Sequence, residues 1–185
     1  MTAIPQFQAF FDHCVGQWST ERTYHYLTQQ MVERSHTDFV IHPLGLDAKA
    51  KVLQDNQRST ELDLKTLPGY QLAFQTVSET GERVSQELNF LFVPQDIQLP
   101  LVEGDYLRDR AYEEAQPMVS HFRFDINTNE LLMRTNYTRV VSVDSITLVN
   151  PRMRIRKILN YQRPVADQPL ETVLLAGFGV EQKQS

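Results

Sequence analysis

Apolar residues recur at helical spacing near the start of the chain, and the spacing then changes to that of strands. Pro5 suits the first turn of a helix, and Gly16 can end the helix in a left-handed conformation. The pattern therefore predicts one short amphipathic helix at the N-terminus. The residues of its apolar face are Ile4, Phe7, Phe10, Phe11 and Cys14.

From Trp18 onward, short runs of alternating or β-rich residues predict a series of strands. Most of the links between them are short and have turn chemistry, as at Glu79–Glu82, Asn127–Asn129 and Asn150-Pro151. The pattern predicts about nine strands. They are residues 18–28, 31–41, 70–78, 83–93, 117–125, 130–137, 140–149, 152–161 and 171–180.

Two links are longer than a hairpin turn. Residues 47–53 have the pattern of a helical turn that Asp47 would cap, and residues 94–115 read as a polar connection with two prolines and one glycine. Successive strands with tight turns favour an antiparallel meander, and closing the sheet removes its edges. We therefore predict an all-β fold: an antiparallel barrel with a short N-terminal helix, wide enough to hold one small ligand.

The composition limits the class of protein. The 185 residues, of which 41% are hydrophobic and 22% charged, suit one domain spanning residues 1–185. A net charge of −5 argues against a nucleic-acid coat. No apolar run approaches the ~20 residues of a membrane span, and the first residues lack a secretory signal. The single cysteine, Cys14, excludes an intrachain disulfide. We expect a cytoplasmic protein.

An arginine stripe is the first candidate for a binding site. Alternation places Arg152, Arg154 and Arg156 on one face of a strand, with Met153 and Ile155 on the other. The arginines either face solvent while the apolar pair faces the core, or bind the carboxylates of an elongated anion. Periodicity alone cannot choose between these interpretations.

Other polar residues carry weaker signals. Trp18, Arg22 and His25 lie on a strand rich in aromatic residues and threonine, which is also ordinary barrel composition. Residues 107–114 are a charge-dense run, usually a solvated loop or short helix. The five histidines lack metal-ligand spacing, so we predict no metal, and Cys14 lies on the apolar face of the helix, as a structural cysteine does.

Three motifs in order resemble the S-type phycobiliprotein lyases (CpcS/CpeS-like), which attach bilin chromophores to the light-harvesting proteins of cyanobacteria and related plastids. The first combines Phe10-Phe11 with Gly16-Gln17-Trp18-Ser19 and Arg22-Thr23-Tyr24-His25. The second is the run at residues 107–114 leading to Pro117, and the third is Asn150-Pro151-Arg152-Met153-Arg154-Ile155-Arg156. The resemblance covers most of the chain.

The resemblance implies a calycin-like barrel close to the lipocalins and fatty-acid-binding proteins. It also implies that phycocyanobilin, phycoerythrobilin or a related bilin binds non-covalently as the transferred substrate, with no permanent cofactor. Arg154 and Arg156 would face the pocket and bind its two propionates. Arg22 and His25 would line the mouth or floor, Trp18 would close the base, and Arg152 would extend the stripe. Asp144 would be the carboxylate that favours a protonated bilin.

The implied partners are the bilin and a cysteine of a phycocyanin, allophycocyanin or phycoerythrin subunit, where a thioether forms at the ethylidene carbon of ring A. The implied location is the cytoplasm of a cyanobacterium or a plastid stroma. Homodimers and heterodimers with a related lyase subunit occur in the family. Two alternatives remain: a bilin chaperone or partner subunit of a two-protein lyase, and a fatty-acid-type carrier on the same barrel.

Overall fold

The computed structural model describes residues 5–110, 116–165 and 168–184. Its helical elements are α1 (Pro5–Cys14), α2 (Leu46–Asp55) and the short 3₁₀ helix η1 (Leu64–Thr66). The strands are β1 (Gly16–Tyr26), β2 (Met31–Pro43), β3 (Gly69–Ser78), β4 (Arg83–Gln98), β5 (Leu101–Arg108), β6 (Met118–Asp125), β7 (Glu130–Asn136), β8 (Val140–Asn150), β9 (Met153–Gln162) and β10 (Val173–Lys183). Among the described residues, no helix is long and apolar enough to cross a membrane.

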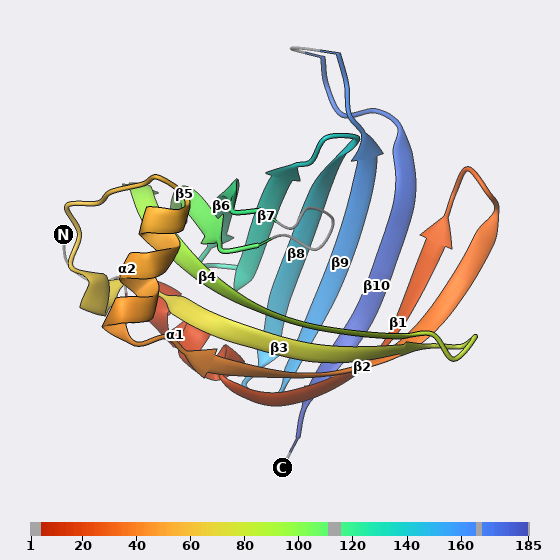
Figure 1. The fold of residues 1–185 in the computed structure, drawn as a ribbon, viewed down its shortest axis with the longest axis horizontal. Coiled ribbons are helices and arrows are strands. Elements are labelled where there is room, and N and C mark those ends of the chain that lie inside the picture. The colour runs from red at the N-terminus through yellow and green to blue at the C-terminus, as the bar shows by residue number, and fades with distance from the viewer. Residues whose placement is uncertain (1–4, 111–115, 166–167, 185) are drawn as a thin grey trace.

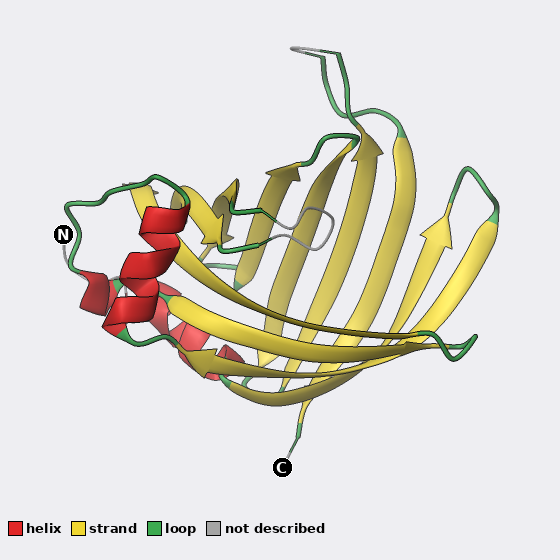
Figure 2. Ribbon diagram, in the orientation of Figure 1, coloured by secondary structure: helices red, strands yellow, loops and turns green. Residues whose placement is uncertain are grey.

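The ten strands form one closed barrel (Figures 1 and 2). Each strand pairs antiparallel with the next along the chain, and β1 pairs with β10 to close the sheet. Closure removes the unpaired edge that an open sheet would expose. The predicted antiparallel barrel with a short N-terminal helix is confirmed.

The predicted count of about nine strands is one too low, because the segment predicted to be a polar connection, residues 94–115, includes the end of β4 and all of β5. Strand β4 continues past Pro94 to Gln98, and β5 returns beside it. A register shift between Pro94 and Asp96 accommodates the proline within the pair. A Cβ atom on Gly104 would collide with the carbonyl oxygen of Val93. The proline and the glycine that suggested a loop are therefore the residues that this irregular strand pair requires.

Helix α1 closes one end of the barrel with aromatic side chains. Phe7 stacks on Phe122 with ring centroids 5.5 Å apart, and Phe11 lies 4.6 Å from Phe92. The chain then turns at Gly16, whose φ of +124° favours glycine. Beyond the helix, the indole nitrogen of Trp18 donates a hydrogen bond to the carbonyl of Cys14. The helix is thus fixed to the barrel at the base of the interior, as its apolar spacing predicted.

Helix α2 lies outside the barrel, next to β4 and β5 (Figure 1). A second buried apolar cluster lies there and includes Val52, Leu53 and Leu67. Lys49 crosses this cluster and donates from Nζ to the carbonyl oxygens of Leu64 and Leu67. The helix predicted at residues 47–53 is present, but the predicted cap is wrong: the N-cap residue is Gly45, and Asp47 lies in the first turn.

Candidate functional site

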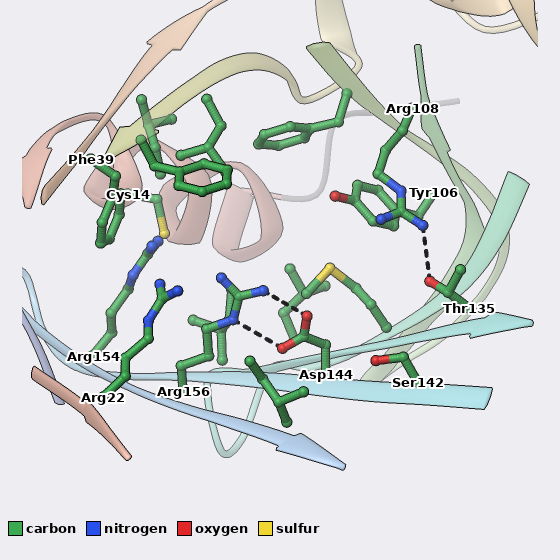
Figure 3. A pocket seen from close by; sticks show the side chains of 18 of the residues that line it. Cys14, Arg22, Phe39, Tyr106, Arg108, Thr135, Ser142, Asp144, Arg154 and Arg156 are labelled. Carbon is green, nitrogen blue, oxygen red and sulfur yellow. Dashed lines mark hydrogen bonds and ion pairs between the residues drawn. The ribbon is translucent and has the colours of Figure 1, made fainter. Parts of the chain in front are cut away.

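A cavity of about 370 Å³ occupies the barrel interior. Its α1 end is aromatic, with Phe10, Phe11 and Phe92 among the lining residues. Charged side chains enter it from strands β1, β8 and β9 (Figure 3). They are Arg22, Asp144, Arg154 and Arg156, and Arg108 lies on another part of the wall.

The guanidinium of Arg154 is the most enclosed of the β9 charges, since the residue is only 4% exposed. Its Nε donates a hydrogen bond to Glu181 on β10. The same guanidinium lies 4.7 Å from the ring centroid of Trp18 and 5.1 Å from that of Phe39. Aromatic faces attract a cation at these distances. Arg154 is therefore held in place before any ligand enters.

Glu181 is fully buried and pairs with two arginines. Besides Arg154, it accepts a hydrogen bond from Arg22 at 3.2 Å. Burial alone would raise the pKa of Glu181, but the charges of Arg154, Arg156 and Arg22 outweigh burial and hold that pKa below its ordinary value of 4.5. The carboxylate therefore stays ionised and fixes both guanidinium groups.

Arg156 and Asp144 form the second ion pair of the cavity. Arg156 donates from Nε to Oδ1 of Asp144 at 2.9 Å and from a terminal nitrogen to Oδ2 at 2.6 Å. Both side chains keep some exposure, 13% and 19% respectively. This two-point geometry fixes the orientation of the guanidinium, and the partial exposure leaves both charges accessible from the cavity.

Three predicted binding residues lie outside the cavity lining. His25 is exposed on the opposite face of β1 from Arg22, because successive residues of a strand point to opposite sides. Arg152 is exposed in the turn before β9. Trp18 is buried behind Arg154 and contacts that guanidinium instead of the cavity. The expectations that His25 lines the mouth or floor and that Arg152 extends the stripe are therefore wrong.

Arg108 is a cavity residue that the sequence placed in a solvated run. It ends β5, is 2% exposed, and donates hydrogen bonds to Ser120, Thr135 and Tyr137. Leu107 beside it is fully buried, so the start of the run is core. Residues 111–114 of the run lie outside the described residues. The sequence did contain a signal for the burial of Arg108. This arginine follows the apolar and aromatic residues Val102, Tyr106 and Leu107.

The thiol of Cys14 lies beside Arg154 at the α1 end of the cavity (Figure 3). Burial raises the pKa of Cys14 above its ordinary value, although the charge of Arg154 opposes that effect. A thiol with a raised pKa is a poor nucleophile at neutral pH. The position agrees with the predicted burial of this side chain on the apolar face of α1.

The arrangement suits an elongated, largely apolar ligand with negative groups. Arg22, Arg154 and Arg156 carry three positive charges against the two negative charges of Asp144 and Glu181, which leaves this cluster with one excess positive charge. The aromatic end offers flat apolar contact, and a low-dielectric cavity strengthens each charge interaction.

The family model of CpeS-like proteins matches residues 6–184. The chain belongs to the CpeS-like family. It is 57% identical over 183 residues to chromophore lyase CpcS/CpeS 1 of Synechococcus sp. (strain JA-3-3Ab), a match that covers 99% of each chain. The predicted family resemblance and the predicted lyase class are confirmed.

Two more distant matches are also named as lyases. The phycocyanobilin lyase subunit CpcS of Picosynechococcus sp. is 22% identical over 158 residues, covering 84% of this chain and 78% of the relative. The structure of the S-type phycobiliprotein lyase CPES from Guillardia theta superposes with a TM-score of 0.76 at 16% identity, covering 97% of this chain and 93% of that one. The barrel is therefore the fold of a known lyase structure.

Proposed function

We propose that this CpeS-like protein binds a linear tetrapyrrole, phycocyanobilin or a related bilin, in its barrel and attaches it to a cysteine of a phycobiliprotein subunit. The observation that carries the proposal is the cluster of three arginines in a cavity whose wall is elsewhere largely aromatic and apolar. A bilin combines a flat apolar chain of four rings with two propionates, so its chemistry complements both parts of the wall.

The three arginine side chains differ in exposure, and we assign them different tasks accordingly. Arg22 and Arg156 keep 13% of their side chains exposed, whereas Arg154 is almost fully covered by Glu181 and its aromatic neighbours. We therefore assign the direct propionate contacts to Arg156 and Arg22. Arg154 adds positive charge behind them and, through Glu181, helps to fix Arg22.

Asp144 is the carboxylate that we place against the pyrrole nitrogens. It lines the cavity one strand away from Arg156, and the bidentate pair fixes its orientation. A carboxylate beside the central nitrogens favours the protonated tetrapyrrole, which is the more electrophilic form.

The attacking thiol comes from the acceptor protein. Its sulfur bonds to the ethylidene carbon of ring A, the carbon–carbon double bond there becomes a single bond, and the thiol proton ends on the adjoining ring carbon. This addition needs no oxidant or reductant. The lyase contributes orientation and exclusion of wrong addition, because a bilin also reacts with thiols unaided.

The test combines the protein with phycocyanobilin and purified apo-subunits of phycocyanin, allophycocyanin and phycoerythrin. We expect a bilin absorbance change on binding, and covalent attachment to one cysteine, detected by mass, faster than in a matched mixture without the lyase. Binding without accelerated attachment to any subunit would favour a chaperone or partner subunit. No absorbance change would refute bilin binding. If oleate binds to the protein and the bilin does not, the result would favour a fatty-acid carrier.

Asp144→Asn is expected to retain phycocyanobilin binding but to shift the bound spectrum to shorter wavelength, because the amide no longer stabilises a protonated bilin. Attachment should slow by on the order of 100-fold, because the amide cannot assist proton transfer. Absorption spectroscopy and the attachment assay measure the two effects. Asp38→Asn, on the exposed outer side of β2, is the control. An unshifted spectrum would remove Asp144 from the mechanism.

A further inference from the structure

Two neutral polar side chains on the cavity wall have no task in the mechanism above. Ser142 on β8 and Asn160 on β9 are paired directly across the two strands. Both line the cavity. Directly opposed side chains of an antiparallel pair have Cβ atoms about 4.5–5.5 Å apart, so the hydroxyl and the carboxamide can contact one ligand group together.

These two side chains differ from the polar residues near them. Thr135, which opposes Ser142 on the next strand, receives a hydrogen bond from Arg108 and shares another with Ser120. The Oδ1 atom of Asn160 is buried and has no hydrogen-bond partner among the described residues, and none of these residues bonds its Nδ2 atom. Because an unpaired buried amide oxygen costs free energy, its presence on the wall of a binding cavity points to a ligand that pairs with it.

We infer that Asn160 and Ser142 bind the lactam edge of a terminal ring of the bilin, an inference that rests on the proposed function. A lactam presents an N–H donor and a carbonyl acceptor side by side, which is the arrangement that a carboxamide complements. The carboxamide of Asn160 turns so that Oδ1, covered in the ligand-free protein, accepts from the lactam N–H, while Nδ2 donates to the lactam carbonyl. The hydroxyl of Ser142 donates a second hydrogen bond to that carbonyl.

The position on β9 selects the ring. Asn160 lies four residues beyond Arg156, about 13 Å along the strand, and away from the end that α1 closes. In a bilin the propionates belong to the two middle rings and the lactams to the two ends. A terminal ring at Asn160 therefore lies toward the barrel end that an acceptor thiol can reach. The structure thus assigns Asn160 and Ser142 as positioning residues for ring A.

Asn160→Leu tests the assignment, with Asn136→Leu on the exposed outer side of β7 as the matched control. We expect Asn160→Leu to weaken phycocyanobilin binding about tenfold in an absorbance titration. Ser142→Ala should weaken it severalfold. Infrared difference spectra should show the lactam carbonyl band at higher frequency in both variants, because a hydrogen bond to that carbonyl is lost.

Thermal unfolding separates ligand recognition from a structural role. An unpaired buried amide oxygen does not stabilise the barrel, so Asn160→Leu should leave the melting temperature unchanged or raise it. If the wild type binds phycocyanobilin but Asn160→Leu binds it equally, with an unmoved lactam band, the inference is wrong and the proposed function stands. If the wild type binds no bilin, the proposed function itself has failed.

Discussion

Glu181→Gln is expected to destabilise the barrel by about 3–5 kcal/mol, the usual cost of removing one partner from a buried ion pair. Glu181 is fully buried and neutralises Arg154 and Arg22. Glutamine has nearly the same shape but no charge, so it leaves Arg154 as an uncompensated cation in a low-dielectric interior. Denaturant unfolding of the ligand-free protein measures the change.

Glu171→Gln is the matched control, because Glu171 is exposed and its substitution should change stability by less than about 0.5 kcal/mol. A double variant, Arg154→Met with Glu181→Leu, should recover part of the lost stability, since it removes the main buried cation with its partner. An effect of Glu181→Gln as small as that of Glu171→Gln would show that the ion pair does not hold the base of the cavity.

The same carboxylate gives the stability a defined pH dependence. The pKa of Glu181 lies below its ordinary value of 4.5 in the folded protein. Its contribution to the free energy of unfolding is therefore complete above the unfolded pKa, and it is lost as the pH falls through the depressed folded pKa. In Glu181→Gln this part of the acid dependence should be absent.

The barrel could be predicted well from the sequence, because apolar and polar residues alternate along the strands and the turns are short. The exception, β5, shows what pattern reading misses. Pro94 and Gly104 read as loop residues, but a register shift accommodates the proline and close packing against Val93 requires the glycine. Both effects depend on how two strands meet, and a single sequence does not contain that information in its periodicity.

From alternation alone, the site was predictable to the level of residue types but not of orientation, and only the family resemblance implied that Arg154 and Arg156 face the pocket. Alternation correctly grouped Arg154 with Arg156, yet it could not show which face of β9 points inward. What turns them inward is the pairing of β9 with its neighbours, which brings Glu181 and Asp144 within reach. Arg152 obeys the same alternation but lies in the turn before β9, which the sequence counted as strand.

Arg156→Met is expected to raise the dissociation constant for phycocyanobilin roughly 10- to 100-fold, since a hydrogen-bonded charge pair contributes about 1.5–3 kcal/mol. Methionine keeps much of the length and apolar contact of the arginine stem, so the loss reports the guanidinium. Arg156→Lys should fall between the wild type and Arg156→Met, because it keeps the charge but not the two-point geometry. An absorbance titration measures all three.

Two companion variants decide what a loss of affinity means. The control Arg152→Met makes the same substitution at an exposed arginine two positions before Arg154, and it should bind phycocyanobilin like the wild type.

Arg156→Met also leaves Asp144 without its partner, and that unpaired charge would repel a propionate. The double variant with Asp144→Asn removes this repulsion. If it binds phycocyanobilin as tightly as the wild type, Arg156 does not bind the propionate and acts only by neutralising Asp144. If it stays weak, as we expect, the guanidinium itself binds the ligand.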